Sequence, residues 1–127
     1  KLFMVQTRVI RDIAASESCV IVGRAANFIL KGHKNCFNVF VHADQEFRKK
    51  RVVHDYMLKP EDAEKVMERK DKERSSYNRH YTGREWDDLN VYDMTVETSL
   101  FGVEGTADMI IKAAKVRFSG RSGEEEC

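Results

Sequence analysis

Residues 19–24 have the sequence CVIVGR, and this stretch is the main indication of the fold class. Four apolar, mostly β-branched residues follow Ser18, which is typical of a strand buried on both faces of a parallel sheet. The run stops at Gly23, and Arg24 comes next. Ligands of open α/β sheets bind beyond the carboxyl ends of the strands, where a guanidinium suits phosphate. Taken alone, a turn with a surface arginine is the simpler interpretation, so the surrounding sequence has to decide.

Helical and strand periodicities alternate on both sides of this stretch. Asp44 is a good N-cap, Pro60 suits a helix start, and Gly32 suits a helix end. We expect helices over 2–15, 25–30, 44–56, 61–77 and 103–118, strands over 19–23, 36–43 and 92–97, a polar aromatic segment over 78–89 and a loop over 98–102. This order predicts an α/β fold: a three-layer parallel sheet with helices on both faces and right-handed crossovers.

The composition fits one soluble domain, which we place at 1–118, followed by a flexible tail at 119–127. Apolar residues make up 42% of the chain and charged residues 34%, and the net charge of +1 argues against bulk nucleic-acid binding. No apolar run approaches the roughly 18 residues that span a membrane. The three cysteines have no metal or disulfide spacing, which favours a reducing cytoplasm.

Residues 44–84 hold most of the Arg and Lys residues, and we interpret the region of about 44–90 as a lid. Arg48 and Arg51 share a helix face just after the second strand. Further along, Arg69, Lys72 and either Arg79 or Arg84 could line one side of a mobile helical hairpin. Cations that close over a phosphoryl group supply most of the catalysis in phosphoryl transfer. The alternative is a solvated helix face on which carboxylates pair with the cations. Those carboxylates are Glu64, Glu68, Asp71 and Glu73.

Other chemistry has weaker support in the sequence. His42 ends the second strand and is either a general base or a structural histidine. No histidine has a ligand spacing that indicates a metal site, and no serine lies in a Gly-x-Ser-x-Gly turn. Tyr81 and Trp86 either stack on a base or anchor their segment to the body of the domain.

Four segments, in this order and spacing, resemble the cytidylate kinase-like family: VIVGRAANFIL, FNVFVHADQEFRKKRV, DKERSSYNRHYTGREW and YDMTVETSLFGVEG. The resemblance covers about residues 3–114. It implies a P-loop kinase fold and the activity of a nucleoside monophosphate kinase. By the same resemblance, Arg24, Asn27 and Arg74 are expected to bind substrate. The catalytic residues that it implies are Arg48, Arg51, Lys72 and Arg79.

Two substitutions depart from the family pattern and leave the acceptor undecided. Ala25 stands where the family has the aspartate of Gly-Arg-Asp, and Ser76 stands where the lid cluster carries a carboxylate. The chain also has no Gly-x-x-x-x-Gly-Lys-Ser/Thr loop. In the resembled fold this loop follows a first strand that lies between the strands we place at 19–23 and 37–43. Because Lys1 begins inside a helical pattern, we expect that upstream residues are missing, rather than donated by a second copy or lost by rearrangement.

The resulting expectation is an ATP- and Mg-dependent phosphotransferase that acts on a nucleoside monophosphate, with these 127 residues inactive on their own. Three alternatives stay open: a non-catalytic pseudokinase, a phosphate- or RNA-binding module, and a kinase of a small non-nucleotide acceptor. A homodimer is compatible with the sequence, and neither a membrane nor a nucleic-acid partner is expected.

Overall fold

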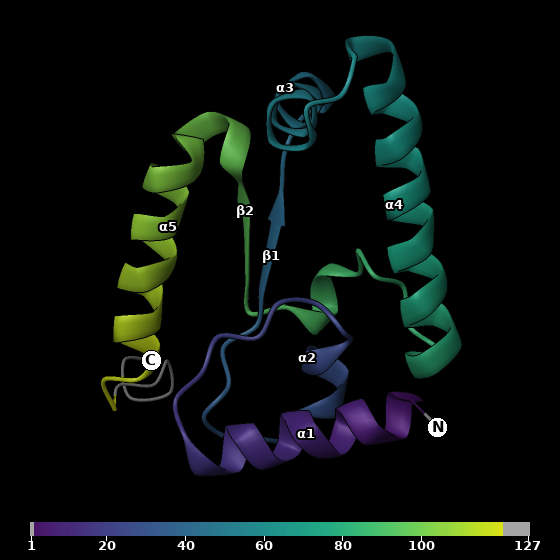
Figure 1. The fold of residues 1–127 in the computed structure, drawn as a ribbon. Helices are drawn as coiled ribbons and strands as arrows, with labels where there is room; N and C mark the ends of the chain where they lie inside the picture. Colours follow the sequence, from purple (N-terminus) through teal and green to yellow (C-terminus); the bar gives the residue numbers. More distant parts are fainter. Residues whose placement is uncertain (1, 121–127) are drawn as a thin grey trace.

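The computed structural model describes residues 2–120, which form helices around a small parallel sheet (Figure 1). The predicted α/β class is confirmed. The tail expected at 119–127 lies, from residue 121 on, outside the described residues. The elements are α1 (Leu2–Ser16), α2 (Ala26–Ile29), β1 (Val39–His42), α3 (Gln45–Tyr56), α4 (Pro60–Thr82), the 3-10 turn η1 (Leu89–Val91), β2 (Met94–Glu97) and α5 (Thr98–Arg117).

The sheet consists of β1 and β2, paired in parallel from Val39 opposite Met94 to His42 opposite Glu97. The strands therefore end at the same edge, where α3 follows β1 and α5 follows β2 (Figure 1). A hydrogen bond of 3.2 Å from the backbone N of Asp44 to Ser99 Oγ joins these two strand-to-helix junctions. The carboxyl edge of the sheet is thus one connected unit.

The strand predicted at 19–23 is wrong. These residues form no strand, and none of residues 19–22 makes a backbone hydrogen bond with the described part of the chain. Val20 is 93% exposed and Val22 is 87% exposed. A strand needs a neighbour to pair its N–H and C=O groups, and residues 2–120 place none beside this run. The expected three-stranded sheet is accordingly two-stranded, with α5 packed along both strands and α4 packed chiefly on α3.

Local signals correctly predict where α3 and α4 begin. The Asp44 side chain accepts a 2.7 Å hydrogen bond from the backbone N of Phe47, and Pro60 is the first residue of α4. The end of α4 was predicted too early, because the helix continues to Thr82. Tyr81 stacks on Phe3 of α1 with ring centroids 4.3 Å apart, and this tertiary contact holds the last turns helical.

The loop predicted at 98–102 is also wrong, because α5 begins at Thr98. Gly102, with φ 72° and ψ 170°, breaks the helix after one turn. From the helical spacing of the sequence, the core face expected for this helix consists of Val103, Ala107, Ile110, Ile111 and Ala114. That face is largely solvent-exposed, since Val103 is 48% and Ile111 53% exposed. Thr106 is instead the buried residue in the longer part of the helix.

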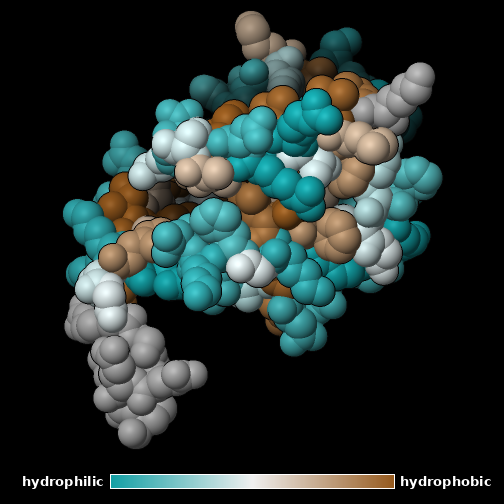
Figure 2. Space-filling view, turned by 90° about the horizontal axis from the view of Figure 1, so that it is seen from below, coloured by the Kyte–Doolittle hydropathy of each residue, from teal (hydrophilic) through white to brown (hydrophobic). Residues whose placement is uncertain are grey.

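The core of the described residues is small. Its buried apolar residues are Ile10, Ala25, Ile29, Ala63, Met67 and Val96. The chain exposes 9844 Å², whereas a compact monomer of its mass exposes about 6,900 Å². Apolar patches accordingly reach the surface between hydrophilic ones (Figure 2). Across residues 2–120, the helices are all too short or too polar to span a membrane.

Candidate functional site

Two candidate arginines from different helices meet at one carboxylate, and we call this group the Arg48–Asp71–Arg74 cluster. Arg48 Nη2 donates to Asp71 Oδ1 at 2.8 Å and to Oδ2 at 2.7 Å, and Arg74 Nη1 donates to Oδ1 at 3.0 Å. The side chains of Arg48 and Asp71 are 27% and 30% exposed. The cluster is therefore partly shielded from water yet accessible to a ligand from solution.

The sequence positions this cluster through short-range features. Capping by Asp44 starts α3 directly after β1, which places Arg48 in the first turn beyond the carboxyl end of the strand. On α4, the buried residues Ala63 and Met67 are four apart, and Asp71 follows four residues later on the same face. Packing of that face on α3 therefore brings the Asp71 carboxylate against Arg48.

An aromatic group supports the cluster from the side of Arg74. The Arg74 guanidinium lies 5.7 Å from the centre of the Trp86 ring, a cation–π contact. Trp86 packs edge-on against Phe40 of β1 at 5.3 Å, and Tyr92 Oη donates to the Trp86 carbonyl at 2.6 Å. Burial raises the pKa of Tyr92. These contacts favour the anchoring interpretation of Trp86, as the stacking of Tyr81 on Phe3 does for Tyr81.

Two other predicted arginines lie in separate ion pairs. Arg51 pairs with Asp55 at 3.3 Å, one turn further along α3. Arg79 donates to Glu85 through Nε at 3.2 Å and Nη2 at 3.0 Å. These hydrogen bonds raise the pKa of Arg79 and lower that of Glu85. These ion pairs agree with the alternative interpretation, in which carboxylates pair with the cations of the lid.

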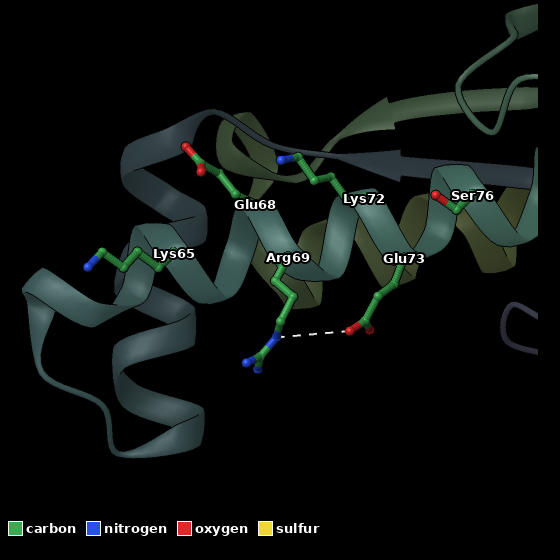
Figure 3. A pocket seen from close by; sticks show the side chains of 6 residues that line it. All are labelled: Lys65, Glu68, Arg69, Lys72, Glu73 and Ser76. Carbon is green, nitrogen blue, oxygen red and sulfur yellow. Dashed lines mark ion pairs between the residues drawn. The ribbon is translucent and has the colours of Figure 1, made fainter.

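Lys72 is exposed and has no hydrogen-bond or ion-pair partner within residues 2–120. It borders an open hollow of about 440 Å³ along α4. Lys72 and Glu68 project from one side of the helix, and Arg69 and Glu73 project from the other (Figure 3). The hollow is also lined by Lys65 and Ser76. It is a charged helix surface, with Arg69 and Glu73 paired at 3.9 Å.

Arg24 and Asn27 lie at α2, outside the Arg48–Asp71–Arg74 cluster. Arg24 has a positive φ of 61°, and its side chain pairs with none of the described residues. It lies two residues before α2. Helix α2 is near the start of the strands, whereas α3 begins where β1 ends (Figure 1). Asn27 is on α2 and makes no side-chain hydrogen bond within the described chain. The structure therefore does not bring these two residues to Arg48 and Arg74.

A second cavity, of about 160 Å³, lies between α3 and α4 beside the cluster. Carboxylates dominate its lining, so it favours groups that donate hydrogen bonds, such as hydroxyls and amines. The lining residues are Gln45, Glu64, Met67, Glu68 and Asp71. In the described range 2–120, no three His, Cys, Asp or Glu side chains are grouped so that they could hold a metal ion. His42, the candidate base, is exposed and lies against Phe40, with ring centroids 6.0 Å apart.

Comparison with known proteins agrees with the resemblance of the four sequence segments. The family model described as cytidylate kinase-like matches residues 1–100. The chain belongs to the cytidylate kinase-like family. One member with a curated name, the cytidylate kinase of Methanococcus vannielii, is 32% identical over 107 residues, which cover 82% of this chain and 61% of that protein.

A solved structure is similar to this cytidylate kinase-like chain in three dimensions. It is the crystal structure of an uncharacterized protein from Eubacterium ventriosum, with a TM-score of 0.86 and 30% identity. The match covers 91% of this chain and 66% of that one. The chain thus spans less than two thirds of both relatives.

The sequence did not indicate that Asp71 belongs to the candidate site of this family member. Its pairing with Arg74, three residues away, is an ordinary helical spacing that the sequence does suggest. Its pairing with Arg48 joins residues 23 apart and depends on how α4 packs against α3. The one available signal was the Ala63–Met67–Asp71 spacing, which continues the buried face of α4 onto a carboxylate.

Proposed function

We propose that this cytidylate kinase-like protein is an ATP-dependent phosphotransferase of P-loop kinase fold, with a nucleoside monophosphate as its acceptor. The observation that carries the proposal is the convergence of Arg48 and Arg74 on one anionic group beyond the carboxyl end of β1, in a chain of this family. Positioning and neutralisation of charge supply nearly all of the catalysis in phosphoryl transfer. Two guanidinium groups fixed by separate helices suit that task.

Each predicted residue has a role in this proposal. Arg48 and Arg74 neutralise the oxygens of a phosphoryl group, and Lys72, which has no partner in the described chain, adds charge from the same helix as Arg74. Arg51 and Arg79 act when the lid closes and exchange their carboxylate partners for phosphate. Arg24 and Asn27 hold the acceptor phosphate. The Phe28 ring of α2 already lies 5.0 Å from the Arg84 guanidinium of the lid, and lid closure brings α2 nearer to Arg48 and Arg74.

A nucleotide also suits the acidic cavity beside the cluster. Glu64 and Glu68 border this space of about 160 Å³, and their oxygens accept hydrogen bonds from sugar hydroxyls or an exocyclic amine. A nucleoside monophosphate joins such donors to a phosphate. The arrangement supports a nucleotide over a purely anionic ligand, and it leaves the identity of the base open, as do Ala25 and Ser76.

ATP and Mg²⁺ belong to the proposed reaction, but we assign them to no residue of this chain. The sequence has no Gly-x-x-x-x-Gly-Lys-Ser/Thr loop, and residues 2–120 form no cluster of acidic or histidine ligands. The side chains present therefore do not fit a Mg²⁺–ATP site. The proposal covers the acceptor and lid chemistry only. A cytoplasmic protein is part of it, because the cysteine pattern fits a reducing compartment.

A non-catalytic relative is the second candidate, and the ion pairs favour it. Four of the predicted site arginines already have carboxylate partners: Arg48, Arg51, Arg74 and Arg79. A protein that keeps the scaffold for contacts with other molecules needs no free arginine. A kinase of a small non-nucleotide acceptor would use the same cations but leave the acidic cavity empty.

Titration and turnover of the full-length protein separate these functions. We expect CMP, dCMP, UMP or AMP to bind in isothermal titration, and ATP to be consumed in a coupled assay. Arg74→Gln should lower kcat/KM by roughly 10²-fold, as loss of one oxyanion-stabilising donor does. Lys50→Gln is the matched control, since it removes an exposed charge from α3 that has no partner within 2–120. Binding without turnover would favour the non-catalytic relative, and failure to bind any nucleotide would remove the kinase proposal.

A further inference from the structure

We propose that the Asp71 carboxylate occupies an oxyanion site formed by Arg48 and Arg74, and that a phosphoryl group of the ligand displaces it. Asp71 then acts as an internal competitor that holds the two arginines in place and lowers their affinity for anions. The identity of the ligand as a phosphoryl compound rests on the proposed function. The competition itself is a property of the three side chains and can be tested without any catalysis.

The geometry at Asp71 is that of a bound anion. Three hydrogen bonds of 2.7, 2.8 and 3.0 Å from two guanidinium groups converge on its two oxygens. Carboxylate and phosphate are the two groups that arginine binds with the same charge-assisted hydrogen bonds. A phosphoryl group that presents two oxygens at this position would receive the same donors.

The cluster also contains N–H donors that are not used by Asp71. Arg48 contacts Asp71 through Nη2 alone, so its Nε and Nη1 groups have no acceptor in the described chain. Arg74 is steadied independently by the Trp86 ring at 5.7 Å. If Asp71 leaves, Arg74 therefore keeps a support, and Arg48 can turn its unused N–H groups toward a ligand.

Displacement requires that the carboxylate has somewhere to go and is not held too tightly. The Asp71 side chain is 30% exposed, so it can rotate toward solvent when an anion takes its place. Water that reaches the carboxylate weakens its ion pairs with Arg48 and Arg74 by screening them. The structure thus combines an ordered anion mimic with a path by which it can leave the arginines.

Asp71 could compete with the ligand or could only brace α3 against α4. Removal of its charge changes the affinity for anions in opposite directions in these two cases. If Asp71 competes with the ligand, Asp71→Asn frees Arg48 and Arg74, so anions bind more tightly. If Asp71 only braces α3 against α4, the same change lets the arginines separate, so anions bind more weakly. The sign of the change in affinity therefore decides between them.

The test is titration of the full-length protein with inorganic pyrophosphate at low ionic strength. We expect Asp71→Asn to tighten binding by on the order of five- to tenfold, the size expected for one nearby, partly screened charge. Glu73→Gln is the matched control: it makes the same change in net charge on the same helix but frees only Arg69. It should tighten binding less than twofold. Equal effects of the two variants, or weaker binding by Asp71→Asn, would overturn the proposal.

A measurement on the unmodified protein covers the case in which Asp71→Asn does not fold. NMR signals of arginine side chains should shift for Arg48 and Arg74 when pyrophosphate is added, while Arg69 stays unchanged. If the Arg48 and Arg74 signals do not move, the proposal fails. If pyrophosphate shifts the Arg48 and Arg74 signals but no nucleotide is turned over, the oxyanion site is supported and the proposed kinase function is rejected. If nucleotide is turned over but these signals do not shift, the kinase function is supported and the oxyanion site is rejected.

Discussion

Arg79 illustrates how one acidic neighbour fixes an arginine at the end of a helix. Gly83, with φ 72°, ends α4 and turns the chain back, so that Glu85 meets the last turn of the helix. The two hydrogen bonds from Arg79 are the main cause of the lowered pKa of Glu85. Both side chains are exposed, so salt weakens the pair.

Substitution of Arg79 should therefore change the titration of Glu85. We expect Arg79→Gln to raise the Glu85 pKa toward its ordinary value, because the hydrogen bonds and the positive charge are lost. Carboxyl chemical shifts followed by NMR from about pH 7 to about pH 2 measure this. Arg69→Gln is the control, since Arg69 pairs with Glu73 instead.

The sign of the accompanying stability effect follows from the direction of the shift. A folded-state pKa below the unfolded one adds stability above about pH 5, and this is lost as the pH falls through the lowered pKa of Glu85. The Arg79→Gln variant should not show this small loss of folding stability at acid pH. An unchanged Glu85 pKa in the variant would show that the pair does not form in solution.

At the scale of elements, the connection between α3 and α4 depends on a single strained residue. Met57 ends α3 with φ 53° and is 92% exposed, and its backbone N bonds to the Val53 carbonyl. A left-handed conformation costs a residue with a side chain about 1–2 kcal/mol, and glycine adopts it freely. The sequence places methionine where glycine would fit best.

Met57→Gly should consequently stabilise the protein. We expect a gain of about 0.5–1 kcal/mol in the free energy of unfolding, since relief of strain exceeds the added entropy of the unfolded chain. Urea denaturation measures the change. Lys50→Gly, at an exposed position inside α3, should instead cost about 1 kcal/mol. A loss of stability from Met57→Gly would show that the Met57 side chain makes a contact that matters.

The contrast among elements shows what local sequence can predict. The starts of α3 and α4 depend on Asp44 and Pro60, whose effects act within one turn, and they were predicted correctly. Residues 19–22 have an equally clear strand pattern, but strand formation depends on a partner elsewhere in the chain. The same holds for the site: the spacing of Arg51 and Asp55 suggests their pair, whereas Arg48 meets Asp71 only through packing.

The whole molecule exposes more surface than a compact domain of its size, and large apolar side chains are part of that surface. Val20 and Val22 lie open to solvent, while Val96 in β2 is 4% exposed. Among residues 19–22 only Ile21 is partly buried, and none of the four makes a backbone hydrogen bond within residues 2–120, so this run contributes little to the stability of these 127 residues.

Two substitutions of the 127-residue chain test this distribution of stability. Val22→Asp should change the free energy of unfolding by less than about 0.5 kcal/mol, as for an exposed position without contacts. Val96→Asp buries an unpaired charge and should abolish cooperative unfolding. Urea titration followed by circular dichroism compares the two. A strong destabilisation by Val22→Asp would mean that residues 19–22 are covered in solution.

The parallel pairing of β1 with β2 has a consequence for biosynthesis. Each pair in the sheet joins residues 55 apart, since Val39 lies opposite Met94. At about 5–20 residues per second, β1 leaves the ribosome roughly 3–11 seconds before its partner strand. The α3–α4 hairpin can form within that time, because its contacts are local. The sheet is therefore completed only after the α3–α4 hairpin, and Val39–His42 is the segment that a chaperone would have to shield from other nascent chains in the meantime.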